Sequence, residues 1–177
     1  AQERLLVLAE EALERFVAQW PDALPDDALQ HLLHAGVQQF AELAHRPQVH
    51  ALWWPRFVQV ARWVVGQERM RRPGLAALRA ELSGELELER PGGRFVVRAR
   101  ADRLEQHADG GVTVVDYKTG QPANKAKVAS GLAPQLPLEA LMVERGAFDR
   151  QAPANVAALL FWHLKGDEDG GEERSAG

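Results

Sequence analysis

ARADRLE at residues 99–105 and VVDYKTG at residues 114–120 are the two stretches from which the architecture of this chain can be predicted. The first belongs to a segment in which apolar and charged side chains alternate, as in a half-buried strand. The second is β-branched and mostly apolar, which is typical of a strand buried on both faces. Asp109, Gly110 and Gly111 between them favour a turn. We therefore expect the two stretches to form an antiparallel hairpin.

Such a hairpin brings polar side chains together. With the turn midway, positions near 102–104 fall roughly opposite positions near 116–118, so Asp102 and Asp116 converge. Lys118 shares a face with Asp116, because side chains alternate along a strand. An interpretation without a functional site also fits the spacing: Asp116 and Lys118 form a surface ion pair, and Asp102 is a turn residue.

Converging carboxylates repel each other, and a divalent cation relieves this repulsion. Hard oxygen ligands favour Mg²⁺ or Mn²⁺ over zinc. A cation held in this way polarises a phosphoryl oxygen and lowers the pKa of a bound water. A neighbouring lysine orients the water or offsets charge on the phosphate. The pattern is that of phosphodiester hydrolysis.

Periodicity predicts the elements on either side of the hairpin. An α/β (α+β) layered domain is expected, with a mixed central sheet flanked by helices and an N-terminal helical region. The helices are expected at residues 1–19, 26–45, 49–70 and 135–145, and the strands at 84–90, 94–104, 112–117 and 155–164.

Composition limits the possible functions. The chain has 177 residues, 46% of them hydrophobic, which suits one globular domain. It has no cysteine, which excludes a disulfide framework, a thiolate zinc site, an iron–sulfur cluster and a cysteine nucleophile. With no cysteine for disulfides and no signal-peptide pattern, we expect a cytoplasmic protein. No apolar run is long enough to span a bilayer, so we expect no membrane partner. The chain opens at Ala1 directly in a helical pattern, and we expect it to be part of a longer protein.

The C-terminal residues are acidic. Residues 167–174 read DEDGGEER and carry a net charge of −4, which is the net charge of the whole chain. We predict that 167–177 form a disordered acidic tail. The domain is then expected to cover 1–166, with a helical part at 1–80 and the sheet core at 81–166.

The two stretches quoted above, followed by PQLPLEALM at 134–142, resemble the PD-(D/E)xK nuclease superfamily, with its restriction-endonuclease-like core. The RecB-like nuclease domain is the most similar branch. Within it, the chain looks most like the C-terminal nuclease domain of AddB-type helicase–nuclease subunits, which act in double-strand break repair. The resemblance extends upstream through LERF (13–16) and WWPRF (53–57).

The resemblance implies roles for individual residues. Asp102 and Asp116 match metal ligands, and Lys118 matches the catalytic lysine. Gln135 matches a glutamine that supports the lysine or a DNA phosphate. The family often has a tyrosine four residues later, where this chain has Glu139.

Two further carboxylates are candidates for the third ligand. Many relatives carry a histidine ligand on the first helix, where this chain has Glu10, which either ligates the same cation or is an exposed helix residue. Glu85, on the first predicted strand, either joins the site or faces solvent.

The family implies a Mg²⁺- or Mn²⁺-dependent deoxyribonuclease, acting as exonuclease or endonuclease in DNA repair and recombination. DNA, the rest of a helicase–nuclease chain and its partner subunit are the implied partners. The cluster of arginines that includes Arg94, Arg98, Arg100 and Arg103 is expected to hold the DNA backbone. A catalytically inactive DNA-binding or scaffold domain of the same fold is the alternative, because the family's histidine and tyrosine are missing.

Overall fold

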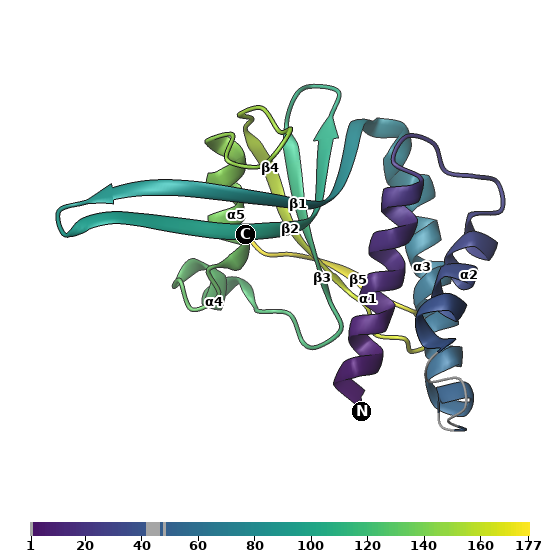
Figure 1. Cartoon of the computed structure of the whole chain (residues 1–177). Helices are drawn as coiled ribbons and strands as arrows, with labels where there is room; N and C mark the ends of the chain where they lie inside the picture. The colour runs from purple at the N-terminus through teal and green to yellow at the C-terminus, as the bar shows by residue number, and fades with distance from the viewer. Residues whose placement is uncertain (1, 42–46, 48) are drawn as a thin grey trace. The chain divides into compact units, whose positions relative to one another are not determined.

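The computed structural model describes residues 2–41, 47 and 49–177, which form two compact units (Figure 1). The helical unit contains the residues up to Gly74, together with Tyr117–Pro122 and Trp162–Glu173. The sheet unit contains Leu75–Asp116, Ala123–Phe161 and Arg174–Gly177. Each unit has its own hydrophobic core. No helix in the described part of the chain is long and apolar enough to cross a membrane.

Three long helices make up most of the helical unit. Apolar residues three and four apart place one face of each helix in a shared core. Gly36 of the second helix lies against the ring of Phe57, so closely that a Cβ would come within 2.1 Å of it. The helices are α1 (Gln2–Gln19), α2 (Ala28–Phe40) and α3 (Trp54–Arg71), with the short π-helix η2 (Val49–Trp53) before α3 and the 3-10 turn η3 (Arg72–Gly74) after it.

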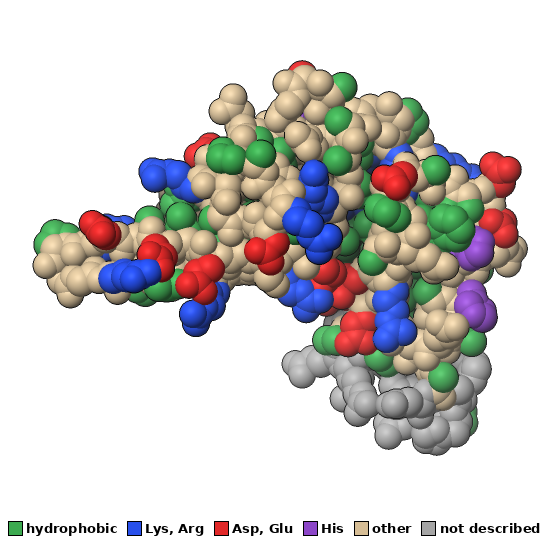
Figure 2. All heavy atoms as spheres, turned by 45° about the horizontal axis from the view of Figure 1, so that its top comes forward, with side chains coloured by type: hydrophobic (Ala, Val, Ile, Leu, Met, Phe, Trp, Pro, Cys, Tyr) green, Lys and Arg blue, Asp and Glu red, His purple; other side chains and the backbone are tan. Residues whose placement is uncertain are grey.

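A long antiparallel hairpin opens the sheet unit. It consists of β1 (Leu75–Arg90) and β2 (Gly93–His107), whose pairing begins at Arg90 and Gly93 beside the turn. Basic and acidic side chains gather along this hairpin (Figure 2). One register holds from the turn back to Ala77, because the turn sets it and alternation preserves it, and it shifts between Ala77 and Leu75.

The remaining strands complete a five-stranded sheet of order β1-β2-β3-β4-β5. Leucine and valine side chains of the strands pack with Leu136, Met142 and Val143 of α5 in one core. The elements are β3 (Val112–Lys118), α4 (Lys125–Ala129), α5 (Gln135–Glu144), β4 (Val156–His163) and β5 (Glu172–Ser175). The predicted mixed sheet with flanking helices and an N-terminal helical region is confirmed.

One boundary and one short helix differ from the sequence-based predictions. β1 begins at Leu75, so the stretch 75–80, assigned above to the helical part, is strand. The predicted C-terminal part of the second helix, 42–45, lies outside the described residues. The short helix α4 was not predicted, because five residues are too few for a helical period to be recognised.

The predicted disordered tail at 167–177 is wrong, because this segment contains β5. In the helical unit, the carboxylate of Glu173 accepts hydrogen bonds from Arg71 and from the indole of Trp162. In the sheet unit, the backbone of buried Ala176 donates to Leu159. Composition suggested disorder, but these partners lie far away in the sequence and leave no periodic signal in so short a segment.

Candidate active site

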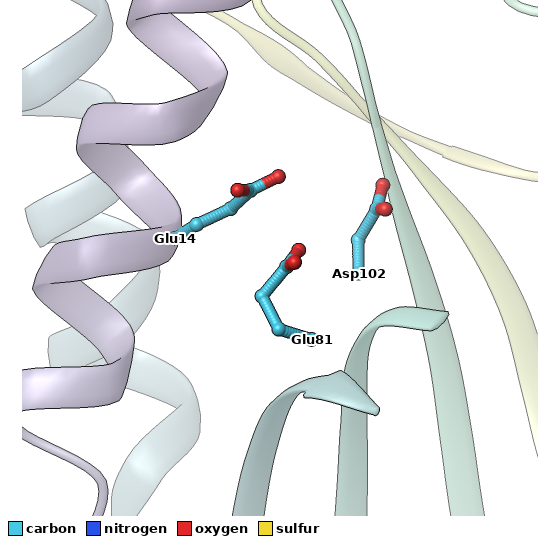
Figure 3. A group of neighbouring side chains, drawn as sticks. All are labelled: Glu14, Glu81 and Asp102. Carbon is cyan, nitrogen blue, oxygen red and sulfur yellow. The ribbon is translucent and has the colours of Figure 1, made fainter. Parts of the chain in front are cut away.

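Two carboxylates face each other across the hairpin of the sheet unit. The pairs Ala80–Arg103 and Leu82–Ala101 flank a position at which Glu81 of β1 lies opposite Asp102 of β2. One carboxylate oxygen of Glu81 lies within 4.8 Å of one of Asp102 (Figure 3). The hairpin therefore presents two acids side by side at one point.

A third acid continues this row on the next strand. β2 and β3 are antiparallel, and Arg103 pairs with Val115. Extending this register by one residue places Asp102 opposite Asp116. The predicted hairpin between the two quoted stretches is thus confirmed. Asp116 is only 1% exposed. Three neighbouring strands of one sheet therefore each contribute a carboxylate at the same level, from Glu81, Asp102 and Asp116.

Sequence reasoning missed Glu81 and considered Glu85 instead. Glu85 is exposed and pairs with Arg98 at 2.6 Å, as expected for a strand residue that faces solvent. Glu81 is partly buried, pairs with Arg100 and has a φ of 58°, which is unusual for a residue other than glycine. The PGG turn at 91–93 could have identified Glu81. A hairpin whose pairing starts at Arg90 and Gly93 places residue 81 opposite residue 102.

Asp116 has a partner on α5 in the same unit. Nε2 of Gln135 donates a hydrogen bond to Oδ1 of Asp116 at 2.5 Å. The same nitrogen donates to Oε1 of Glu139 at 3.2 Å. The structure therefore brings Gln135 into contact with the acid that the sequence singled out, and Glu139 into contact with Gln135.

Lys118 ends β3, two residues after Asp116, and belongs with its neighbours to the helical unit. The backbone amide of Leu164 donates to the carbonyl of Lys118 at 2.7 Å, which holds the end of the strand. Next to it, the hydroxyl of Thr119 donates to Oε1 of Glu10 at 3.1 Å. Figure 3 also draws Glu14, which follows Glu10 by one turn of α1. Glu10 thus lies beside the end of β3, and its role as a ligand stays a prediction.

The ARADRLE stretch also contains a buried ion pair. Nε of Arg103 donates to Oε1 of Glu105 at 2.8 Å, and both side chains are fully buried. Both residues lie on β2, two apart, so they point to the same side of the strand. Arg103 was counted above among the arginines that contact DNA. Its burial corrects that expectation, because a fully buried side chain cannot contact DNA.

Exposed arginines of the hairpin also have acidic partners. Arg94 pairs with Glu87, and Arg98 pairs with Glu85. Both arginine side chains are more than half exposed, so water screens these pairs and they contribute little to stability. Such arginines are accessible to a ligand, which would have to compete with a neighbouring glutamate.

The comparison with known families agrees with this arrangement. The model of the PD-(D/E)XK nuclease superfamily matches residues 8–176. The chain belongs to this superfamily. The matched range includes β5 and ends at Ala176, which agrees with the ordered C-terminal segment.

Relatives of this superfamily member occur in Rickettsia. The chain is 34% identical to an uncharacterized protein of Rickettsia typhi over 86 residues, which are 49% of this chain and 10% of that protein. It is 30% identical to an uncharacterized protein of Rickettsia bellii over 97 residues, which are 55% of this chain and 12% of that protein. The matches thus span about a tenth of the length of these relatives.

PD-(D/E)XK nucleases typically use divalent metal ions, and the donor set of this chain fits such an ion. Glu81 and Asp102 offer oxygens within 4.8 Å of each other, and Asp116 follows in the next register position. Carboxylate oxygens are the ligands that hard cations prefer. Glu81 and Asp102 are therefore the two carboxylates of the sheet unit whose oxygens lie close enough to share one ion, with Asp116 on the neighbouring strand.

Proposed function

We propose that this chain is a metal-dependent deoxyribonuclease domain that hydrolyses phosphodiester bonds with Mg²⁺ or Mn²⁺. The row of carboxylates from Glu81, Asp102 and Asp116, in a member of a nuclease superfamily, is the observation that carries the proposal. The alternative without a functional site was a surface ion pair between Asp116 and Lys118. Asp116 does not lie at the surface, because it is buried and accepts a hydrogen bond from Gln135.

Each residue has a separate role in this proposal. Glu81, Asp102 and Asp116 hold the cation, which supplies Lewis-acid polarisation of a phosphoryl oxygen and a more acidic water when it is bound. Gln135 fixes the orientation of the Asp116 carboxylate through its hydrogen bond. Lys118 donates to the attacking water or offsets the negative charge that develops on the phosphate. Because these groups contact phosphate rather than bases, the cut is independent of sequence.

The wider context is also a proposal. The resemblance to AddB-type subunits suggests a helicase–nuclease that acts in double-strand break repair and recombination. The matches cover about a tenth of the Rickettsia relatives, which suits a nuclease domain within a much larger protein. DNA, the remainder of that protein and a partner subunit are the proposed partners.

A cleavage assay tests the proposal. Labelled single- and double-stranded DNA is incubated with the folded chain and Mg²⁺, Mn²⁺ or EDTA. We expect cutting with either metal and none with EDTA, and labelling of each end in turn separates exonuclease from endonuclease products. If a folded sample cuts neither substrate in any metal but still binds DNA, the inactive DNA-binding domain is the correct assignment.

A further inference from the structure

We propose that Glu139 is a positioning residue that holds the Gln135 amide in place, so that Gln135 fixes the carboxylate of Asp116 for the cation. This inference rests on the proposed metal site. It assigns a role to a position at which the chain departs from the tyrosine that the family often has.

The geometry lies entirely within the sheet unit. Gln135 is the first residue of α5, and Glu139 follows one helical turn later, on the same face of the helix. Nε2 of Gln135 donates to Asp116 at 2.5 Å and to Glu139 at 3.2 Å. One amide nitrogen therefore bridges two carboxylates.

Both carboxylates are buried: Asp116 is 1% exposed and Glu139 is 2% exposed. An unpaired charge in such a place would be costly, so a buried glutamate requires a specific reason. Gln135 lies at the end of a helix, and its side chain has several rotatable bonds, which are costly to order. The hydrogen bond to Glu139, a buried acceptor one turn along the helix, offsets part of the entropy lost when the Gln135 side chain is ordered.

Hydrogen-bond chemistry favours one orientation of the amide between two ionised carboxylates. An ionised carboxylate is an acceptor only, whereas a glutamine amide has two N–H donors and one acceptor oxygen. With Asp116 on one side and Glu139 on the other, the NH₂ group satisfies both, one hydrogen to each. Turning the amide over would place its oxygen against a carboxylate. Glu139 therefore keeps the donor directed at Asp116 and, through it, fixes the plane of that carboxylate.

Mn²⁺ titration calorimetry of the whole chain tests this role without reference to cleavage. Glu139→Met removes the acceptor and keeps an apolar side chain of similar length, whereas Glu139→Gln removes the charge but keeps an acceptor oxygen. Loss of an outer partner of a metal ligand typically weakens metal binding by about 10- to 100-fold. We expect such a loss in Glu139→Met and affinity within about threefold of the unaltered chain in Glu139→Gln. Glu144→Gln, an exposed change on the same helix, is the matched control and should change nothing.

The pattern across variants separates positioning from other roles. In a Gln135→Met background, Glu139→Met should have no further effect, because Glu139 acts through Gln135. Equal losses in Glu139→Gln and Glu139→Met, or an undiminished loss without Gln135, would identify a direct ligand or a charge effect and overturn the proposal. If Glu139→Met does not fold, proton exchange of the Gln135 amide in the unaltered chain decides. Slow exchange of both Nε2 protons supports the bridge, because the bond to Asp116 alone protects only one of them, and rapid exchange of one proton overturns it.

The same titration separates this inference from the proposed function. An unaltered chain that binds Mn²⁺, with Glu139→Met binding equally well, overturns the positioning role alone. An unaltered chain that binds no Mn²⁺ and cuts no DNA contradicts the nuclease proposal and this inference together.

Discussion

Glu81 of β1 lies opposite Asp102 of β2, with one oxygen of each carboxylate within 4.8 Å of the other. Like charges placed directly across two strands destabilise a sheet unless something compensates them. Arg100, which pairs with Glu81, is one such group. A divalent cation bound at this point would compensate both acids.

Glu81→Gln should therefore weaken both metal binding and cleavage. Removing a charged oxygen ligand is expected to reduce divalent cation affinity by at least about 100-fold, since loss of an outer partner alone costs 10- to 100-fold. Glu85→Gln is the control, because Glu85 lies four residues away on the same strand, is exposed and pairs with Arg98. Calorimetry with Mn²⁺ and a cleavage assay measure both variants. Equal Mn²⁺ affinity and equal cleavage rates in the two variants would show that Glu81 is not a metal ligand.

Asp116→Ala should abolish cutting and leave the fold intact. The change removes a proposed metal ligand and also the repulsion between neighbouring carboxylates, so stability should not fall steeply. Cleavage rates and circular dichroism of the purified variant check the two halves of this expectation. A folded variant that retains more than a few per cent of the activity would contradict the assignment of Asp116.

Lys118→Ala should separate binding from chemistry. The ammonium group is proposed to act on the water or the phosphate, and it is not a metal ligand. Cutting should fall by about 100-fold or more, as for loss of one charge-stabilising donor, while Mn²⁺ affinity stays the same. Lys127→Ala, an exposed change on α4, is the control and should cut normally. If metal affinity disappeared as well, the role of Lys118 would be structural.

The sequence predicted the elements that carry a strong local signal. The DYKTG end of a buried strand, the turn before it and the helix at 135–145 were placed within a few residues, because apolar periodicity and turn residues are local. Glu81 was missed because its relation to Asp102 depends on the register of a long hairpin. The contact of Gln135 with Asp116 likewise depends on how α5 lies against β3.

The buried pair Arg103–Glu105 makes a stability prediction. Removing one partner leaves the other charge buried, which typically costs 3–5 kcal/mol, whereas replacing both with apolar residues is often neutral. Glu105→Leu should therefore reduce the free energy of unfolding by about 3–5 kcal/mol. Arg103→Met combined with Glu105→Leu should recover most of that loss. Urea unfolding of the three chains gives the comparison, and a double variant as unstable as the single one would show that Arg103 has a further essential contact.

The C-terminal segment should contribute to stability, despite its acidic composition. Deleting the residues after Asp167 removes β5, the ion pair between Arg71 and Glu173, and the acceptor of the Trp162 indole. It also removes Gly171, which packs so closely on Trp63 that a Cβ would lie 2.7 Å from the ring. We expect the free energy of unfolding of the truncated chain to fall by several kcal/mol and its melting temperature to fall by at least about 5 °C, since 1 kcal/mol shifts the melting temperature by about 2–4 °C in a domain of this size.

Glu173→Gln alone should reduce the free energy of unfolding by about 1 kcal/mol, because it weakens one partly exposed ion pair and keeps an oxygen for the indole. Thermal unfolding followed by circular dichroism measures both changes, and a truncated chain with an unchanged melting temperature would show that β5 is not docked in solution.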